Sequence, residues 1–124
     1  MSSLVKIFVH VTFHTKLDEP WLTAEVEAEL LPWIGQILLN MDAKLVEGGC
    51  FDNHVHLLLE LPPKSCIEDV VRRAKGSSSH WLRRRWPELK TAGWQQGFAA
   101  FSVDYRNPQP VIDYIRNQRS HHAP

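Results

Sequence analysis

The stretch FDNHVHLLLELPP, residues 51–63, decides the fold because it combines an apolar run, two histidines and turn-forming residues at both ends. Asp52 and Asn53 favour a turn before the run, and the paired prolines end it. Successive side chains of a strand point to opposite faces, so the odd-numbered residues of 54–61 share an apolar face. Both histidines lie on the other face. We therefore expect a strand over 54–61 that has one core face and one polar face.

The two histidines occupy adjacent positions on that polar face. His54 and His56 are roughly 7 Å apart along the strand, given ~3.3 Å per residue. Imidazole is the commonest metal ligand among side chains, so the pair can bind a cation between the two rings. An ordinary pair of half-exposed histidines is the alternative, and an HxH pattern alone does not decide between them.

Length and composition limit the class of protein. A chain of 124 residues with 44% hydrophobic and 23% charged residues is typical of one globular domain, which we expect to span 1–124. No stretch approaches the roughly 20 apolar residues that cross a membrane, and the N-terminus lacks the pattern of a secretory signal. The two cysteines form no CxxC pair. These features predict a cytoplasmic location.

A net charge of zero hides an uneven distribution of charge. Residues 1–63 carry three lysines and nine acidic residues, a formal charge of −6. Residues 64–124 carry eleven basic and five acidic residues, a formal charge of +6. A basic half suits a polyanionic partner such as nucleic acid. The alternative is that the two halves neutralise each other in the fold.

The first half of the chain predicts a strand, a helix and a hairpin. Residues 4–14 are rich in β-branched and aromatic residues, which favours a strand. Apolar residues recur at helical spacing over 23–41, where Pro32 should kink or divide the helix. A strand over 44–51, weakened or bulged at Gly48 and Gly49, should pair with the strand over 54–61.

The second half predicts a helix, a strand and a final helix. Ser65 and Glu68 have the spacing of a capping box, so a helix should begin at Cys66. Residues 76–79 should interrupt this helix before it resumes as far as Pro87. A strand over 97–104 and a helix from Pro110 to the C-terminus follow. The order β-α-β-β-α-β-α predicts an α+β, ferredoxin-like (RRM-like) fold: an antiparallel sheet with helices on one side, plus a C-terminal helix.

The last predicted helix carries a phenol and a carboxamide on one face. Tyr114 and Gln118 are four residues apart, so their side chains are neighbours on the helix surface. A phenol can act as a nucleophile, and an amide oxygen can bind a cation. The alternative is a tyrosine packed in the core with an exposed hydroxyl, and a surface glutamine.

Four motifs in order carry a resemblance to a known family. They are HVH at 54–56, KGSS at 75–78, WQQGF at 94–98 and YIRNQRSHH at 114–122. Together with the first strand, they resemble the HUH single-tyrosine transposases of small single-strand insertion sequences, including the REP-associated tyrosine transposases. The resemblance covers nearly the whole chain.

The resemblance implies a metal-dependent transposase that cleaves and rejoins single-stranded DNA through a 5′-phosphotyrosine intermediate, at hairpin-flanked element ends. It implies Tyr114 as the nucleophile and His54, His56 and Gln118 as the ligands of a divalent cation. Mg²⁺ and Mn²⁺ both suit two imidazoles and an amide oxygen. It also implies a homodimer in which the helix bearing Tyr114 can dock in the partner's site.

Binding of DNA requires further residues. Basic side chains on the predicted helix are candidates for phosphate contacts, with a solvated basic surface as the alternative: Arg72, Arg73, Lys75, Arg83, Arg84 and Arg85. Trp94, Phe98 and Phe101 can stack on bases, but we expect them to pack in the core. We expect His10 and His14 to have structural or supporting roles. We do not assign His121 and His122 as ligands.

Two other functions fit the same fold. One is a catalytically silent ferredoxin-like module that binds single-stranded nucleic acid. The other is a domesticated HUH nuclease that acts on repetitive elements. The combination of His54, His56, Tyr114 and Gln118 favours an enzyme over the silent module.

Overall fold

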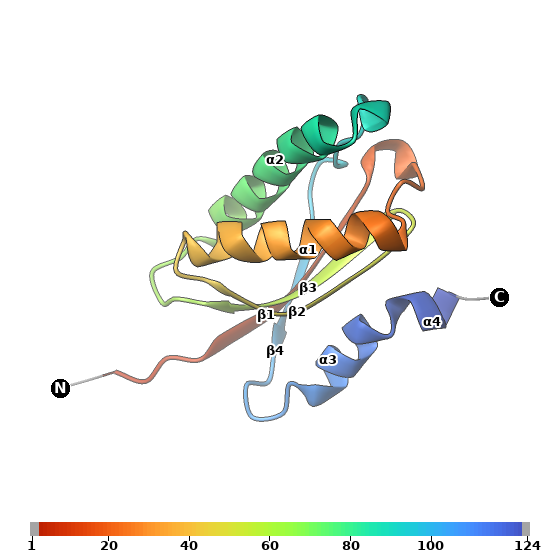
Figure 1. Cartoon of the computed structure of the whole chain (residues 1–124). Helices are drawn as coiled ribbons and strands as arrows, with labels where there is room; N and C mark the ends of the chain where they lie inside the picture. The colour runs from red at the N-terminus through yellow and green to blue at the C-terminus, as the bar shows by residue number, and fades with distance from the viewer. Residues whose placement is uncertain (1–2, 123–124) are drawn as a thin grey trace.

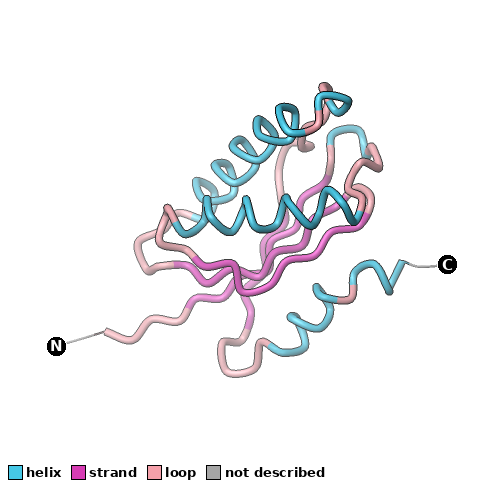
Figure 2. Tube along the Cα trace, viewed as in Figure 1, coloured by secondary structure: helices cyan, strands magenta, loops and turns pink. Residues whose placement is uncertain are grey.

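A four-stranded antiparallel sheet with helices on both faces forms the protein (Figures 1 and 2). The structure is a computed structural model that describes residues 3–122. The strands lie in the order β2-β3-β1-β4. Their bounds are β1 Ile7–His14, β2 Lys44–Phe51, β3 His54–Leu61 and β4 Ala99–Val103. This order and the alternating helices confirm the predicted α+β, ferredoxin-like fold.

The helices form two unequal layers. The bounds are α1 Ala24–Leu39, α2 Ile67–Arg85, α3 Gln109–Arg116 and α4 Gln118–His122, with short 3-10 turns η1 Lys16–Asp18 and η2 Pro87–Leu89. Figure 1 shows α1 and α2 together on one face of the sheet and α3 and α4 on the other. None of the helices within 3–122 has the length and apolar character needed to cross a membrane.

The core lies between the sheet and the two long helices. Helix α1 begins after Thr23, whose side chain accepts a hydrogen bond from the Val26 N–H at 3.2 Å. One stripe of α1 is buried at helical spacing and includes Leu30 and Ile34. Alternate residues of β3, including Leu57, are buried against it. The apolar run quoted above therefore supplies the core through one face of its strand.

Several predicted details in the helices are wrong. Helix α1 is not divided at Pro32; this residue and Ala28, whose carbonyl loses its N–H partner, both lie on the exposed side of the helix. Helix α2 runs without a break through 76–79, where the Ser78 and Ser79 hydroxyls donate to carbonyls three residues earlier. It begins at Ile67, and no side chain caps it, so the expected capping box is not formed.

Two other boundaries differ from the prediction. The irregularity in β2 lies between Leu45 and Glu47, whereas Gly48 and Gly49 pair in register with β3. The C-terminal helix is broken at Asn117, which separates α3 from α4. The break allows the last residues to turn toward α1 and β2, which holds the final segment against the body of the protein.

Candidate active site

The face of β3 opposite the core carries the two histidines. The ring centroids of His54 and His56 are 5.1 Å apart, and the rings are nearly perpendicular at 85°. Strand β1 lies beside β3, with His14 opposite His54 and Thr12 opposite His56. Helices α3 and α4 cover the β2 and β3 part of this face. The alternation inferred from the sequence therefore places both imidazoles under the C-terminal helices.

His54 contacts an amide oxygen through each ring nitrogen. Nδ1 lies 2.9 Å from Asn53 Oδ1, and Nε2 lies 3.3 Å from Gln118 Oε1. Each amide is oriented by a second hydrogen bond: Gln118 Nε2 donates to the Tyr114 carbonyl, and Asn53 Nδ2 donates to Asp18 Oδ1. A neutral imidazole has one N–H and cannot donate to both oxygens. A cation beside one of the two nitrogens is compatible with this arrangement.

The contact between His54 and Gln118 fits a metal ion. Two ligands at about 2.1 Å on adjacent octahedral positions are about 3 Å apart, close to the observed 3.3 Å between Nε2 and Oε1. Gln118 is only 1% exposed, so its carboxamide has one fixed position. With His56 these groups supply two nitrogens and one oxygen. Within residues 3–122 no group of three or more His, Cys, Asp or Glu side chains is placed to hold a metal, so this ligand set depends on Gln118.

His10 on β1 supports His56. His10 Nε2 lies 3.0 Å from His56 Nδ1. Burial lowers the pKa of His10 from its ordinary value, which favours the neutral ring. A neutral His10 can accept the Nδ1–H of His56 and so orient Nε2 of His56 as the ligand atom. This agrees with the supporting role expected from the sequence, but the partner became evident only from the pairing of β1 with β3.

Tyr114 lies beside these histidines in the same chain. Its ring centroid is 5.6 Å from that of His56 and 6.2 Å from that of His10, and the residue is 47% exposed. Gln118 follows one turn later, as expected, and its amide bonds to the Tyr114 carbonyl across the Asn117 break. The structure thus brings together all four residues singled out as catalytic or metal-binding. Docking of the Tyr114 helix in a second subunit stays a prediction.

Ion pairs that the sequence did not reveal hold the last helices in place. Arg116 binds Glu47 at 2.9 Å, and Arg119 binds Glu27 at 3.0 Å. The second carboxylate oxygen of Glu27 accepts the Cys50 N–H at 2.6 Å. These partners are far apart in the sequence, so no local pattern could have identified them. They fix α3 and α4 against α1 and β2, and with them Tyr114 and Gln118.

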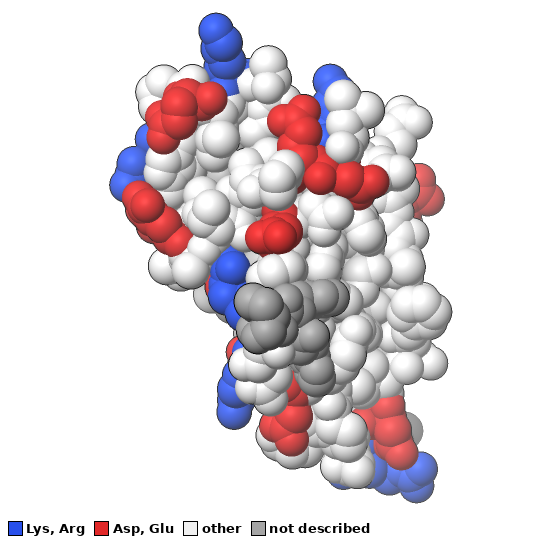
Figure 3. All heavy atoms as spheres, turned by 90° about the vertical axis from the view of Figure 1, so that its right-hand side faces the viewer, with Lys and Arg blue, Asp and Glu red and all other residues white. Residues whose placement is uncertain are grey.

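The basic candidates for DNA contacts lie on α2, in the layer on the other side of the sheet. Several already have partners: Arg72 pairs with Asp69, Arg85 with Glu29, and Arg83 donates to the Ala92 carbonyl. Within 3–122, Arg73 and Arg84 form no ion pair and are exposed. Figure 3 shows separate acidic and basic groups on the face it presents, with no continuous basic surface there. Contacts of these six residues with DNA stay a prediction.

The three aromatic candidates separate into two environments. Trp94 packs against Phe13 and Trp21, with ring centroids 4.8 and 5.1 Å away, as expected for a core residue. Phe98 and Phe101 are 37% and 61% exposed, so the expectation of core packing is wrong for both. Phe98 directly precedes β4 and Phe101 lies within it, and β4 is an edge strand of the sheet. The side chains of His121 and His122 lie outside the described residues.

Similarity to known proteins agrees with this geometry. Residues 3–118 match the family model "Transposase IS200 like". Over 94 residues the chain is 30% identical to the transposase of insertion sequence element IS200 from Salmonella typhimurium, an alignment that covers 68% of this chain and 61% of that relative. It is 25% identical over 114 residues to the ISDra2 transposase TnpA of Deinococcus radiodurans, covering 88% of this chain and 81% of that protein.

Two solved structures share the fold. A crystal structure assigned as a transposase from Deinococcus radiodurans R1 superposes with a TM-score of 0.79 at 26% identity, covering 95% of each chain. The REP-associated tyrosine transposase bound to a REP hairpin superposes with a TM-score of 0.72 at 18% identity, covering 99% of this chain and 75% of that one. Because the family match extends from before β1 to Gln118 and includes every residue of the site, the chain belongs to the IS200-like transposase family.

Proposed function

We propose that this chain is a metal-dependent transposase that cleaves and rejoins single-stranded DNA with Tyr114 as its nucleophile. The observation that carries the proposal is the position of the Tyr114 ring, 5.6 Å from His56, in a site that also holds His54 and Gln118. Membership of the IS200-like transposase family supports it. The chain aligns with only 61% of the length of the IS200 transposase. The activity of that whole protein therefore does not follow from family membership alone, and it is part of the proposal.

In the proposed reaction the phenolic oxygen of Tyr114 attacks a backbone phosphorus of the substrate strand. The bond between phosphorus and the 3′-oxygen breaks, and that oxygen leaves as a 3′-hydroxyl after taking up a proton. The phosphate remains joined to the 5′-oxygen of the downstream nucleotide and, through the new bond, to the phenolic oxygen of Tyr114. The phenolic proton passes to solvent, which reaches Tyr114 because about half of this residue is exposed.

The covalent link preserves one phosphodiester bond. A second strand can therefore attack it with its 3′-hydroxyl, form a new DNA–DNA bond and release the tyrosine, which regains its proton. The step needs no nucleotide cofactor because one phosphodiester replaces another. In a homodimer, a second Tyr114 would serve the second cleavage.

The other site residues would hold and orient the phosphate. A divalent cation, Mg²⁺ or Mn²⁺, bound to His54, His56 and Gln118 would supply positive charge for the crowded anionic transition state. His10 would keep His56 in the ligating orientation, and Asn53 would do the same for His54 through its Nδ1 contact at 2.9 Å. Neither role requires a change in the backbone.

We extend the proposal to DNA with hairpins. One neighbour of the same fold is bound to a REP hairpin, which makes such a hairpin the natural first substrate to test here. Phe101 is 61% exposed on the edge strand, and its ring centroid lies 6.5 Å from that of His10, so it offers an aromatic surface beside His10 for an unpaired base. Action on DNA would take place in the cytoplasm, at the nucleoid, and we propose that location for the chain.

Tyr114→Phe tests the proposal. The wild-type chain, incubated with single-stranded hairpin DNA and Mn²⁺ or Mg²⁺, should form a covalent protein–DNA band on a denaturing gel, and Tyr114→Phe should form none. The matched control is Tyr105→Phe, which alters the second tyrosine of the chain, 54% exposed in the turn after β4. Tyr105→Phe should retain the band. Equal behaviour of the wild type and Tyr114→Phe would exclude Tyr114 as the nucleophile and favour a silent binding module.

A further inference from the structure

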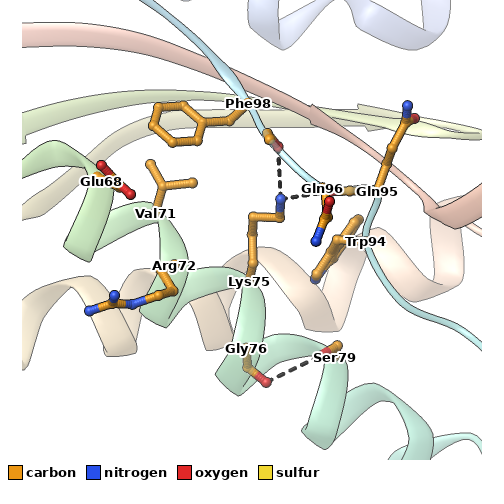
Figure 4. A pocket seen from close by; sticks show the side chains of 11 residues that line it. Glu68, Val71, Arg72, Lys75, Gly76, Ser79, Trp94, Gln95, Gln96 and Phe98 are labelled. Atoms are coloured by element: carbon orange, nitrogen blue, oxygen red, sulfur yellow. Dashed lines mark hydrogen bonds between the residues drawn. The ribbon is translucent and has the colours of Figure 1, made fainter.

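A groove separates α2 from the segment Trp94–Phe98, away from the histidines. Its volume is about 630 Å³, within the range of small-ligand sites. Figure 4 shows Phe98 above Val71, with Lys75 reaching across to the segment and the side chain of Gln96 beside it, whereas the side chain of Gln95 points away from Lys75. We call this cavity the α2 groove.

The same segment also borders the side of the sheet that carries the active site. A smaller pocket of about 220 Å³ lies between the end of β1 and the segment, and both cavities share Gln95, Gln96, Gly97 and Phe98. Its β1 wall includes Thr12 and His14, whose partners in β3 are His56 and His54. The segment therefore lines both the pocket beside the histidine-bearing strands and the α2 groove.

The groups that line the groove suit an unpaired nucleotide. Phe98 is 37% exposed and presents an aromatic ring on which a base can stack. Within the part of the chain described, the side-chain amide of Gln96 forms no hydrogen bond, so a donor and an acceptor are available for a base edge. Arg72 supplies a cation for a phosphate, although it pairs with Asp69 at 2.9 Å and Glu68 also lines the groove, which together limit the net charge.

The segment is braced before any ligand binds. Lys75 donates to the carbonyls of Gln95 and Gly97, both at 2.7 Å, and the indole N–H of Trp94 donates to Ser78 Oγ at 3.0 Å. Gly97 has a φ of 86°, which a residue with a side chain adopts only under strain. A preformed wall reduces the entropy lost on binding. Lys75 therefore acts as a brace for the segment in this structure.

We propose that the α2 groove binds one unpaired nucleotide of the substrate strand, beside the nucleotides held at Tyr114. Phe98 stacks on its base, Gln96 contacts the base edge, and Arg72 contacts the adjacent phosphate. This inference rests on the proposed function, because it takes single-stranded DNA as the ligand.

An abasic scan tests the groove separately from cleavage. A fluorescent hairpin DNA with single-stranded flanks is made as a series in which one flanking base at a time is removed, and binding is measured by anisotropy in EDTA. With the wild-type chain, one abasic position should weaken binding about tenfold, since stacking of a base on an aromatic ring has that order of effect. With Phe98→Ala the intact DNA should bind about tenfold more weakly, and the penalty at that abasic position should disappear.

Matched variants separate stacking from folding. Phe98→Trp should retain both the affinity and the penalty, Phe98→Leu should lose both, and Tyr105→Ala, an exposed aromatic elsewhere, should match the wild type. Circular dichroism checks that each variant is folded. A flat abasic scan, or a penalty that persists in folded Phe98→Ala, would overturn the groove assignment. If that result accompanies a Tyr114-dependent covalent band, the groove proposal alone fails; if the band is missing but the scan shows the predicted pattern, only the proposed reaction fails.

Discussion

The two faces of the central sheet differ in how completely they are covered. Helices α1 and α2, of 16 and 19 residues, cover the core face, and Leu57 on that face is 1% exposed. Helices α3 and α4, of 8 and 5 residues, cover only the β2 and β3 part of the other face. His54 and His56 there are only partly buried. One strand, β3, thus contributes alternate residues to stability and to the candidate chemistry, and the two contributions should be separable by mutation.

The largest effect is expected from a substitution on the histidine face, which should slow DNA cleavage without lowering the stability of the protein. His56→Ala removes a candidate ligand, so cleavage should fall by about 10²–10³-fold, the cost of removing one group that stabilises transition-state charge. The free energy of unfolding should change by less than about 1 kcal/mol, because the side chain is only partly buried. Gel-based cleavage rates, Mn²⁺ binding by electron paramagnetic resonance and thermal unfolding measure these quantities. His80→Ala, on the exposed side of α2, is the control; undiminished Mn²⁺ binding in His56→Ala would contradict the ligand assignment.

The next largest effect is expected on the core face of β3, where a substitution should lower stability and leave the cleavage rate unchanged. Leu57→Ala leaves a cavity between the sheet and the helices and should lower the free energy of unfolding by about 2–5 kcal/mol. At a temperature where both proteins are folded, the variant should form the covalent product at about the wild-type rate. Denaturant unfolding followed by a cleavage assay checks both parts. Leu17→Ala, at a position 79% exposed, should change neither. A large loss of rate in fully folded Leu57→Ala would show that the two faces are not independent.

The smallest effect concerns two adjacent glycines of β2 that face opposite ways. A Cβ on Gly49 would collide with the backbone carbonyl of Ile115 in α3, which cannot move without the helix. Gly49→Ala should therefore displace Tyr114 and Gln118 and slow cleavage by about 10–100-fold. A Cβ on Gly48 would lie 2.8 Å from the terminal Cδ2 of Leu31, a side-chain atom that can rotate away. Gly48→Ala should cleave nearly as the wild type does, and equal rates for the two variants would contradict this account of how α3 is positioned.

Local pattern was sufficient for the elements that rely on periodicity. The alternation in 54–61 correctly assigned the core and histidine faces of β3, and helical spacing placed Tyr114 and Gln118 one turn apart. Local pattern failed where neighbours in space decide. Helix α2 continues through 76–79 because it packs on the sheet and its serines bond back to the helix, and Phe101 is exposed because no helix covers β4.

The sequence by itself determined the order of elements, the two faces of β3, the set of His54, His56, Tyr114 and Gln118, and the family resemblance, since each depends on residue identity at short spacing. Only the tertiary structure decided that His10 supports His56, that Arg119 reaches Glu27, and that the segment 95–98 lines both the α2 groove and the pocket at the end of β1. These contacts link residues distant in the chain. The free energy that places them comes from burial and strand pairing over the whole domain, which no local pattern encodes.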